Sequence, residues 1–167
     1  MSGVVVWICG LPSSGKSTLA VRVRELLRER RVPACLLDGD EARREVFPSL
    51  GYGEHDREAF YAGLASLAAL LARDDLIVIV AATAHRRLFR ERARAKAPRF
   101  LEVFVDADAE ECRARDAKGL YAASRDTMKG SLPGVHVAFE PPHAPDIVAR
   151  GGHDEAAAAA IVRSATS

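Results

Sequence analysis

The 167-residue sequence contains no asparagine and no glutamine, and it has 4 lysines beside 20 arginines. Without asparagine there is no Asn-Lys-x-Asp segment of the kind that reads guanine, so a GTPase-type switch is not expected. The scarcity of lysine makes each lysine informative. Arginine is the background choice in this chain, and the two side chains are not equivalent at a tight phosphate site.

The sequence also lacks an excess of one charge and a long apolar run. Its 24 basic and 23 acidic side chains leave a net charge of +1, which argues against nucleic acid or an anionic membrane surface as a partner. No apolar run approaches the ~20 residues of a membrane-spanning helix. The residues after Met1 do not resemble a secretion signal. We therefore expect a cytoplasmic protein with no membrane and no nucleic-acid partner.

Cysteine is scarce as well, and its spacing excludes two kinds of site. Cys9, Cys35 and Cys112 fit neither a metal centre nor a disulfide framework, so we expect reduced side chains in the core. Nearly half of the residues, 49%, are apolar. This length and composition predict a single domain over residues 1–167.

Short apolar runs rich in β-branched residues alternate along the chain with segments of helical spacing. The runs predict strands at 4–9, 34–37, 76–82, 101–105 and 146–149, and the segments predict helices at 16–31, 41–47, 56–72, 86–96, 109–115 and 153–164. Strict alternation favours right-handed crossovers between parallel strands. The prediction is an α/β fold with a five-stranded, mostly parallel sheet covered by helices on both faces.

One stretch near the C-terminal third is too rich in proline and glycine to be regular. Residues 126–145 contain Gly130, Pro133, Gly134, Pro141, Pro142 and Pro145. Long loops in compact domains often carry binding or catalysis, so we expect a lid or acceptor loop around residues 115–145. A poorly ordered connection is the alternative.

Residues 10–18 read Gly-Leu-Pro-Ser-Ser-Gly-Lys-Ser-Thr, between an expected strand and an expected helix. This is the pattern of a phosphate-binding loop, in which backbone N–H groups and the helix N-terminus surround a polyphosphate. The glycines permit unusual backbone conformations, Lys16 reaches the β- and γ-phosphates, and the Ser17 hydroxyl binds Mg²⁺. The expected ATP-binding residues here are Gly10, Ser13, Ser14, Gly15, Lys16, Ser17 and Thr18.

Two carboxylates follow the second expected strand, in the segment Asp38-Gly39-Asp40. Ligands of parallel sheets bind beyond the carboxyl ends of the strands. Carboxylates there can orient a metal ion or accept a proton from an attacking hydroxyl. Asp38 and Asp40, with Lys16, are the catalytic candidates. The alternative for Asp40 is that it only caps a helix beginning at Glu41.

Several cationic side chains are expected near the same edge of the sheet. Arg43, Arg57, Arg86, Arg87 and Arg90 lie in segments that begin there. Each of them could simply be a solvated surface residue, but a phosphoryl-transfer site depends on such charges. His85 is either a general base or a polar loop residue. The other histidines lack ligand spacing, so no metal is assigned to them.

The chain resembles adenylylsulfate kinases from about Val4 to Val148. The resemblance rests on residues 10–18, Asp38-Gly39-Asp40 with Arg43, Leu50-Gly51-Tyr52 followed by Asp56-Arg57, residues 102–106, and Arg115-Asp116-Ala117-Lys118-Gly119-Leu120-Tyr121. Many nucleotide-binding proteins share the phosphate loop, whereas the Lys-Gly-Leu-Tyr segment is more specific. The resemblance implies a P-loop kinase fold.

It further implies transfer of the γ-phosphoryl group of MgATP to the 3′-hydroxyl of adenylylsulfate, by a homodimer. Asp38 would be the base or a metal-orienting acid, and Arg115 would contact the base of ATP. Among the substrate-binding residues, Arg43 and Arg57 would hold the anionic group and Tyr52 would stack near the substrate. The substrate-binding set is Asp38, Asp40, Arg43, Tyr52, Arg57, Lys118, Leu120 and Lys129.

The chain departs from the family pattern around the acceptor. Phe60 replaces an asparagine, Ala62 replaces an arginine, and residues 83–86 read Thr-Ala-His-Arg where the family has Ile-Ser-Pro-Phe or Ile-Ser-Pro-Tyr. Residues 130–134 lack the aromatic side chain of the family's lid. Two alternatives therefore stay open: another small nucleotide-like acceptor, such as a cytidine diphosphate derivative, or a non-catalytic nucleotide-binding module.

Overall fold

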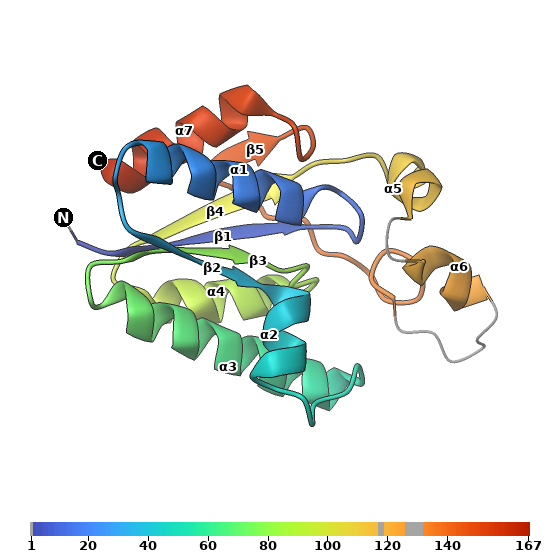
Figure 1. The fold of residues 1–167 in the computed structure, drawn as a ribbon. Helices are drawn as coiled ribbons and strands as arrows, with labels where there is room; N and C mark the ends of the chain where they lie inside the picture. The colour runs from blue at the N-terminus through green and yellow to red at the C-terminus, as the bar shows by residue number, and fades with distance from the viewer. Residues whose placement is uncertain (1, 117–118, 126–131) are drawn as a thin grey trace.

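The computed structural model describes residues 2–116, 119–125 and 132–167. One sheet runs through the middle of the molecule (Figure 1), with the strand order β2-β3-β1-β4-β5. Its strands are β1 (Val4–Gly10), β2 (Ala34–Asp38), β3 (Ile77–Ala81), β4 (Phe100–Val105) and β5 (Ile147–Ala149). All four neighbouring pairs are parallel. The predicted α/β architecture is confirmed.

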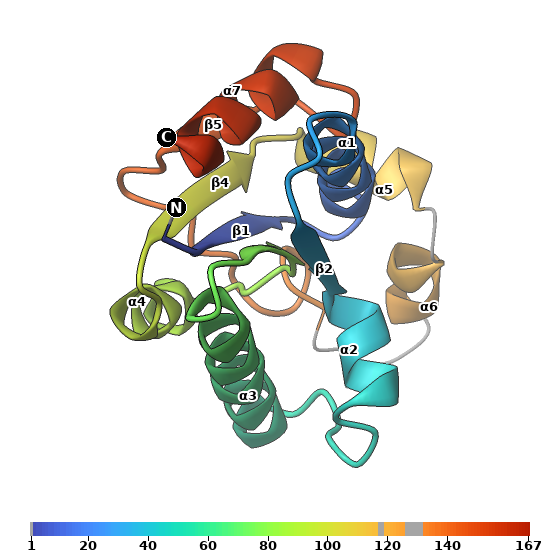
Figure 2. The same ribbon diagram turned by 60° about the vertical axis from the view of Figure 1, so that its left-hand side comes forward.

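Helices cover both faces of this sheet, as predicted. The helices are α1 (Lys16–Glu29), α2 (Gly39–Glu45), α3 (Glu54–Ala72), α4 (Arg87–Lys96), α5 (Ala109–Arg115), α6 (Leu120–Arg125) and α7 (Glu155–Thr166). Figures 1 and 2 show α1 and α7 on one face, and α3 with α4 on the other. The short helices α2, α5 and α6 lie toward the edge at which the strand arrows end.

The first strand shows why the sheet is buried on both sides. Val4, Val6 and Ile8 pack into the core formed with α1 and α7, whereas Val5 and Trp7 pack into the core under α3 and α4. Successive side chains of a strand point to opposite faces, so a strand buried on both faces must be apolar throughout. The free thiols of Cys9 and Cys112 are buried too, and that of Cys35 is half-buried.

Helix α6 is the one element of the described chain that the sequence did not predict. The Asp116 carboxylate accepts 2.9 Å hydrogen bonds from the N–H groups of Tyr121 and Ala122 and so fixes the start of this helix. Helix α6 lies within the loop expected around residues 115–145. Residues 132–145, the last described part of that loop, contain no helix and only an isolated bridge between Pro133 and Val137. In the ranges that the structure describes, no helix is long and apolar enough to cross a membrane.

Candidate active site

The predicted phosphate loop joins β1 to α1 and adopts a conformation that requires glycine. Gly15 has φ +102°, and a side chain there would place Cβ 2.4 Å from the Gly152 nitrogen. Gly10 has φ +155°, with Val105 O only 2.9 Å from a would-be Cβ. L-residues with side chains rarely adopt such angles. The predicted need for glycine at both positions is confirmed.

Polar groups of this loop are arranged for a ligand. The Oγ atoms of Ser13 and Ser14 are buried, and neither has a hydrogen-bond partner among the described residues. No side chain of those residues caps α1, so the N–H groups of its first turn depend on a ligand or water. Lys16 Nζ donates to the carbonyl oxygens of Gly10 (3.1 Å) and Leu11 (2.7 Å). Unpaired donors at a helix N-terminus favour a bound anion.

Asp38 connects the loop to the end of β2. Its Oδ2 accepts a 2.5 Å hydrogen bond from Ser17 Oγ, and its Oδ1 accepts from the N–H groups of Asp40 (3.0 Å) and Glu41 (3.4 Å). The alternative that Asp40 caps a helix beginning at Glu41 is wrong, because α2 begins at Gly39 and Asp38 is its cap. Asp40 lies exposed in the first turn of α2.

The Ser17 and Asp38 pair fits a magnesium ion. Mg²⁺ prefers oxygen ligands and is usually held by one or two carboxylates together with substrate phosphates and water. A hydroxyl and a carboxylate meet here beside the phosphate loop. In the described part of the chain no group of three or more His, Cys, Asp or Glu side chains could hold a metal by itself.

Three of the five arginines expected at this edge bind carboxylates instead of facing a ligand. Arg86 pairs with Glu54 at 3.0 Å and Arg87 with Glu140 at 3.9 Å. Arg90 is 1% exposed and pairs with Glu102 at 2.9 Å. Their charges are already balanced, so these arginines stabilise the fold.

Arg43 and Arg57 differ from the other three. Neither lies within 4.0 Å of a carboxylate in the ranges described, while the Arg43 guanidinium stacks on the rings of Phe60 (3.9 Å) and Tyr52 (4.4 Å). Arg57 is only 7% exposed, and its guanidinium lies 5.9 Å from the Tyr52 ring. Burial lowers the pKa of Arg57, and the charge of Arg43 lowers it further. A buried cation without a counter-ion favours an anionic ligand.

The two aromatic rings that Arg43 contacts differ in their exposure to solvent. Tyr52 is 57% exposed and Phe60 is 2% exposed, so Arg43 lies between a solvent-facing ring and a core ring. Phe60, where the family has asparagine, offers Arg43 a cation–π contact and no hydrogen bond. The Phe60 ring therefore holds Arg43 in place, although the sequence departs from the family pattern at this residue.

His85 lies in the loop between β3 and α4, as the interpretation of a polar loop residue predicted, but it is buried. Its side chain is buried beside the rings of Tyr61 and Phe89, and Nδ1 has no partner among the described residues. Burial lowers the pKa of His85 to about 4, and the charges of Arg57 and Arg86 add to the effect. The imidazole is therefore neutral at pH 7 and a weak general base.

The remaining expected site residues follow β4. Arg115 is exposed at the end of α5, 3.8 Å from Glu111, and Leu120 is 39% exposed at the start of α6. Lys118 and Lys129 lie outside the described residues. A contact that the sequence did not predict comes from Tyr121, whose buried hydroxyl donates a 2.9 Å hydrogen bond to the Pro12 carbonyl. Burial raises the pKa of Tyr121 to about 12, so this donor stays protonated.

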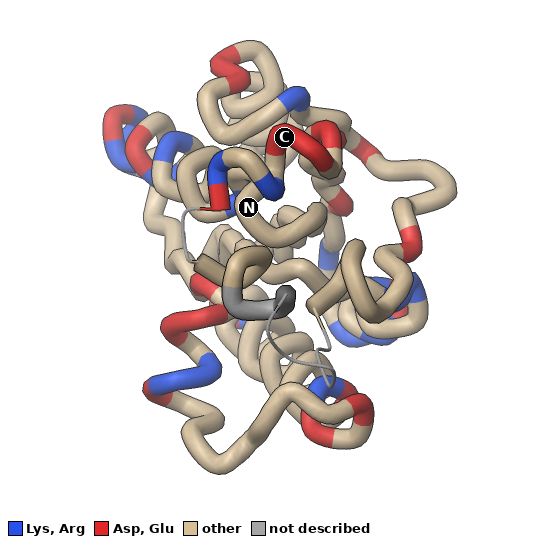
Figure 3. Tube along the Cα trace, turned by 90° about the vertical axis from the view of Figure 1, so that its right-hand side faces the viewer, with Lys and Arg blue, Asp and Glu red and all other residues tan. Residues whose placement is uncertain are grey.

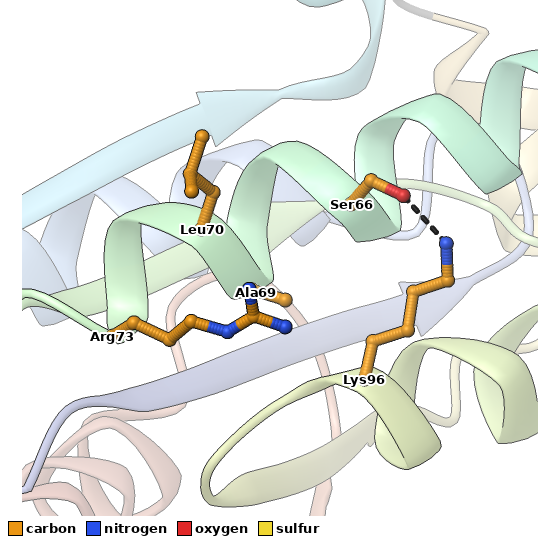
Figure 4. A pocket seen from close by; sticks show the side chains of 5 residues that line it. All are labelled: Ser66, Ala69, Leu70, Arg73 and Lys96. Carbon is orange, nitrogen blue, oxygen red and sulfur yellow. Dashed lines mark hydrogen bonds between the residues drawn. The ribbon is translucent and has the colours of Figure 1, made fainter.

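Figure 3 views the molecule from the side at which the strand arrows of Figure 1 end, and segments with Lys or Arg and segments with Asp or Glu both appear on that side. A hollow away from the site residues lies between α3 and α4 (Figure 4) and is lined by Ser66, Ala69, Leu70, Arg73 and Lys96. Within it, Lys96 Nζ lies 2.6 Å from Ser66 Oγ. It contains none of the expected site residues and adjoins the opposite end of α3 from Arg57.

Comparison with known proteins decides the family. The family model of adenylylsulphate kinase matches residues 2–150. The chain belongs to the adenylylsulphate kinase family. An adenylyl-sulfate kinase from Synechococcus sp. is 38% identical over 148 residues, covering 89% of this chain and 85% of its own. One from Chloroflexus aurantiacus is 40% identical over 146 residues, covering 87% and 78%.

A solved structure extends this adenylylsulphate kinase match to three dimensions. The Mycobacterium tuberculosis APS kinase, solved in complex with AMPPNP and APS, superposes with a TM-score of 0.88 at 34% identity and covers 96% of both chains. That kinase therefore binds an ATP analogue and adenylylsulfate on the same fold. The resemblance drawn from the sequence motifs is confirmed, and the alternatives of another acceptor or a silent module are not favoured.

Proposed function

We propose that this protein transfers the γ-phosphoryl group of ATP to the 3′-hydroxyl of adenylylsulfate. The observation that carries the proposal is that a phosphate loop and a pair of arginines lie at one edge of the sheet. Among the described residues, the buried Ser13 and Ser14 hydroxyls of the loop have no hydrogen-bond partner and the two arginines have no carboxylate partner. The loop suits the donor, and the arginines suit an anionic acceptor. The kinase family to which the chain belongs uses both.

On the donor side, the N–H groups of the loop, the Ser13 and Ser14 hydroxyls and Lys16 would bind the phosphates. Lys16 Nζ, which now bridges two loop carbonyls, would exchange these contacts for the β- and γ-phosphate oxygens. Thr18 follows in the first turn of α1. We assign Arg115 a contact with the base of ATP by resemblance to the family.

Ser17 and Asp38 would hold Mg²⁺. When bound, the ion neutralises charge on the β- and γ-phosphates. Of the two roles expected for Asp38, orienting the metal's ligands is favoured by its contacts, because both carboxylate oxygens already accept hydrogen bonds. The transition state of phosphoryl transfer is loose, so the reaction needs positioning more than a strong base. Asp40 would lie beside the attacking hydroxyl.

On the acceptor side, Arg43 and Arg57 would bind the phosphate and sulfate oxygens of adenylylsulfate. Charge-assisted hydrogen bonds from guanidinium groups are strong. An anion bound by both arginines would also offset the repulsion between the like charges of Arg43 and Arg57. Tyr52 would stack on the acceptor with its exposed ring. Lys118, Leu120 and Lys129 are assigned to the acceptor loop by resemblance.

An acceptor panel tests this proposal. Purified protein is mixed with MgATP and, separately, adenylylsulfate, cytidine diphosphate, a cytidine diphosphate sugar or no acceptor, and ADP release is followed. Of the four mixtures, we expect ADP release only in the one that contains adenylylsulfate. The rate of ADP release should fall on the order of a hundredfold in Lys16→Ala. It should stay unchanged in the surface control Lys96→Ala. Release with a cytidine nucleotide, or with every acceptor equally, contradicts the proposal.

We further propose that the enzyme acts as a cytoplasmic homodimer, by resemblance to its family. The measurement is light scattering on eluted protein, with an expected mass of twice the 18.0 kDa of the chain. A mass of 18.0 kDa at micromolar concentration contradicts it.

A further inference from the structure

The phosphate loop has one carbonyl that is bound by a side chain far away in the sequence. The Tyr121 hydroxyl, 109 residues from Pro12, donates a 2.9 Å hydrogen bond to the Pro12 oxygen, and both residues are buried. The next two carbonyls toward the N-terminus, those of Leu11 and Gly10, accept from Lys16 Nζ. Side chains therefore bind three consecutive loop carbonyls.

The Pro12 contact determines where the following N–H points. The peptide between Pro12 and Ser13 is trans, so its carbonyl and its N–H lie in one plane and point in opposite directions. With the Pro12 oxygen held toward Tyr121, the Ser13 N–H is held away from Tyr121. A phosphate loop binds its ligand through such N–H groups.

The backbone conformation of Ser13 is unfavourable and has to be held by contacts with other residues. Its φ of +60° lies in the left-handed region, which costs free energy for a residue with a side chain. Its buried Oγ has no partner among the described residues, so the hydroxyl does not hold the conformation. Such strain persists where the surroundings fix it, and it concentrates at ligand sites.

Tyr121 is itself fixed from the other side. Asp116 binds the N–H groups of Tyr121 and Ala122 with one carboxylate oxygen each, and its own carbonyl accepts from the Gly119 N–H at 2.9 Å. Asp116 thus makes three hydrogen bonds, with Gly119, Tyr121 and Ala122. These contacts place a neutral, buried donor against the loop.

We propose that Tyr121 is a positioning residue of the donor site. Its hydroxyl fixes the Pro12–Ser13 peptide so that the Ser13 N–H is directed at a phosphate of ATP. The assignment rests on the proposed kinase function, but it concerns ATP binding and can be tested without an acceptor.

The test is Tyr121→Phe, which removes the hydroxyl and keeps the ring. Losing one neutral hydrogen bond that orients a phosphate-binding group weakens binding of the ATP analogue AMPPNP with Mg²⁺ about fivefold by calorimetric titration. The KM for ATP rises by the same factor, while the KM for adenylylsulfate and the melting temperature change little. Tyr61→Phe is the matched control, because that buried hydroxyl accepts a 3.1 Å hydrogen bond from the Ala84 N–H, in the core under α3 and α4. Its AMPPNP affinity stays within twofold of the original.

A second variant acts on the same contact from its far end. Asp116→Asn keeps one acceptor oxygen for the two N–H groups and holds Tyr121 less firmly, so AMPPNP binding weakens in the same direction by a smaller factor. A lower melting temperature with unchanged AMPPNP affinity in both variants would overturn the assignment and leave Tyr121 a packing residue. If the unmodified protein binds AMPPNP but does not phosphorylate adenylylsulfate, the kinase proposal fails and the titrations still decide the role of Tyr121.

Discussion

The Ser17 hydroxyl and the Asp38 carboxylate lie 2.5 Å apart, although 21 residues separate them in the sequence. This contact joins the first turn of α1 to the end of β2. It places an acidic group beside the phosphate loop, at the position where a metal-bound triphosphate would meet its acceptor. Asp38 also caps α2, so its structural and its chemical contribution must be separated by experiment.

Asp38→Asn, with Asp108→Asn as its matched control, separates the two. Both aspartates cap seven-residue helices by accepting from two backbone N–H groups. Each substitution should cost up to about 1 kcal/mol of stability, seen in denaturant unfolding, because a weaker cap remains. Turnover should fall on the order of a hundredfold only in Asp38→Asn, because only Asp38 adjoins Ser17. Equal turnover in the two variants would refute a chemical role for Asp38.

Arg57→Met should change binding and stability in opposite directions. Arg57 is a buried cation with no carboxylate partner in the described part of the chain, so removing its charge should raise the melting temperature by roughly 2 to 4 °C. The KM for adenylylsulfate should rise on the order of tenfold or more, because a charge-assisted contact is lost. The exposed Arg92, paired with Glu58 at 2.8 Å, is the control, and Arg92→Met should alter neither quantity. A lower melting temperature with unchanged KM in Arg57→Met would contradict the anion-site assignment.

The pH dependence of stability should report the burial of His85. The pKa of His85 is lowered to about 4 in the folded protein, below its ordinary value of about 6.5. Between these values the unfolded chain binds the proton and the folded chain does not, so stability falls as pH drops from 6.5 toward 4. The full difference is on the order of 3 kcal/mol. Urea unfolding at pH 7 and pH 4.5 should show a larger loss in the original protein than in His85→Phe. Parallel losses would mean that His85 is protonated in the fold.

Arg90 and Arg94 both bind Glu102 and should differ in what they contribute. Arg90 is 1% exposed and also donates to the carbonyls of Ala84 and Glu140, whereas Arg94 is 45% exposed. Arg90→Leu should destabilise by about 3 to 5 kcal/mol, because it removes the 2.9 Å partner of a largely buried carboxylate, leaving it only the longer contact with Arg94, and removes the side-chain donor to two carbonyls. Arg94→Leu should cost at most about 1 kcal/mol. Similar midpoints of urea unfolding for Arg90→Leu and Arg94→Leu would show that the contacts of Arg90 contribute little to the free energy of unfolding.

The meeting of Ser17 with Asp38 could be predicted from the sequence, because parallel strands end at one edge of the sheet. Asp38 ends β2, and Ser17 lies in the first turn of α1, after the loop that follows β1. Which arginines face a ligand could not be predicted. Arg86, Arg87 and Arg90 share the edge with Arg43 and Arg57, but their partners Glu54, Glu140 and Glu102 come from distant segments. Only the tertiary structure shows that their charges are balanced.

Helix α6 and the burial of His85 could not be predicted from the sequence, for related reasons. The helix is six residues long and begins where the Asp116 side chain binds two N–H groups, a local contact without periodicity. His85 directly follows Ala84, whose φ of +43° turns the chain after β3, and it comes to lie between two aromatic rings. Neither feature leaves a pattern in apolar spacing.

The most direct measurement of the central claim follows the phosphorus atom itself. ATP with a radioactive γ-phosphorus is incubated with the protein, Mg²⁺ and either adenylylsulfate or its 3′-deoxy analogue. The labelled product is isolated by chromatography, and the position of its new phosphate is determined by proton and phosphorus NMR on the same product made from unlabelled ATP. The account predicts label on the 3′-oxygen of adenylylsulfate and no transfer to the deoxy analogue. Label found only in inorganic phosphate, or transferred equally to the deoxy analogue, would contradict it.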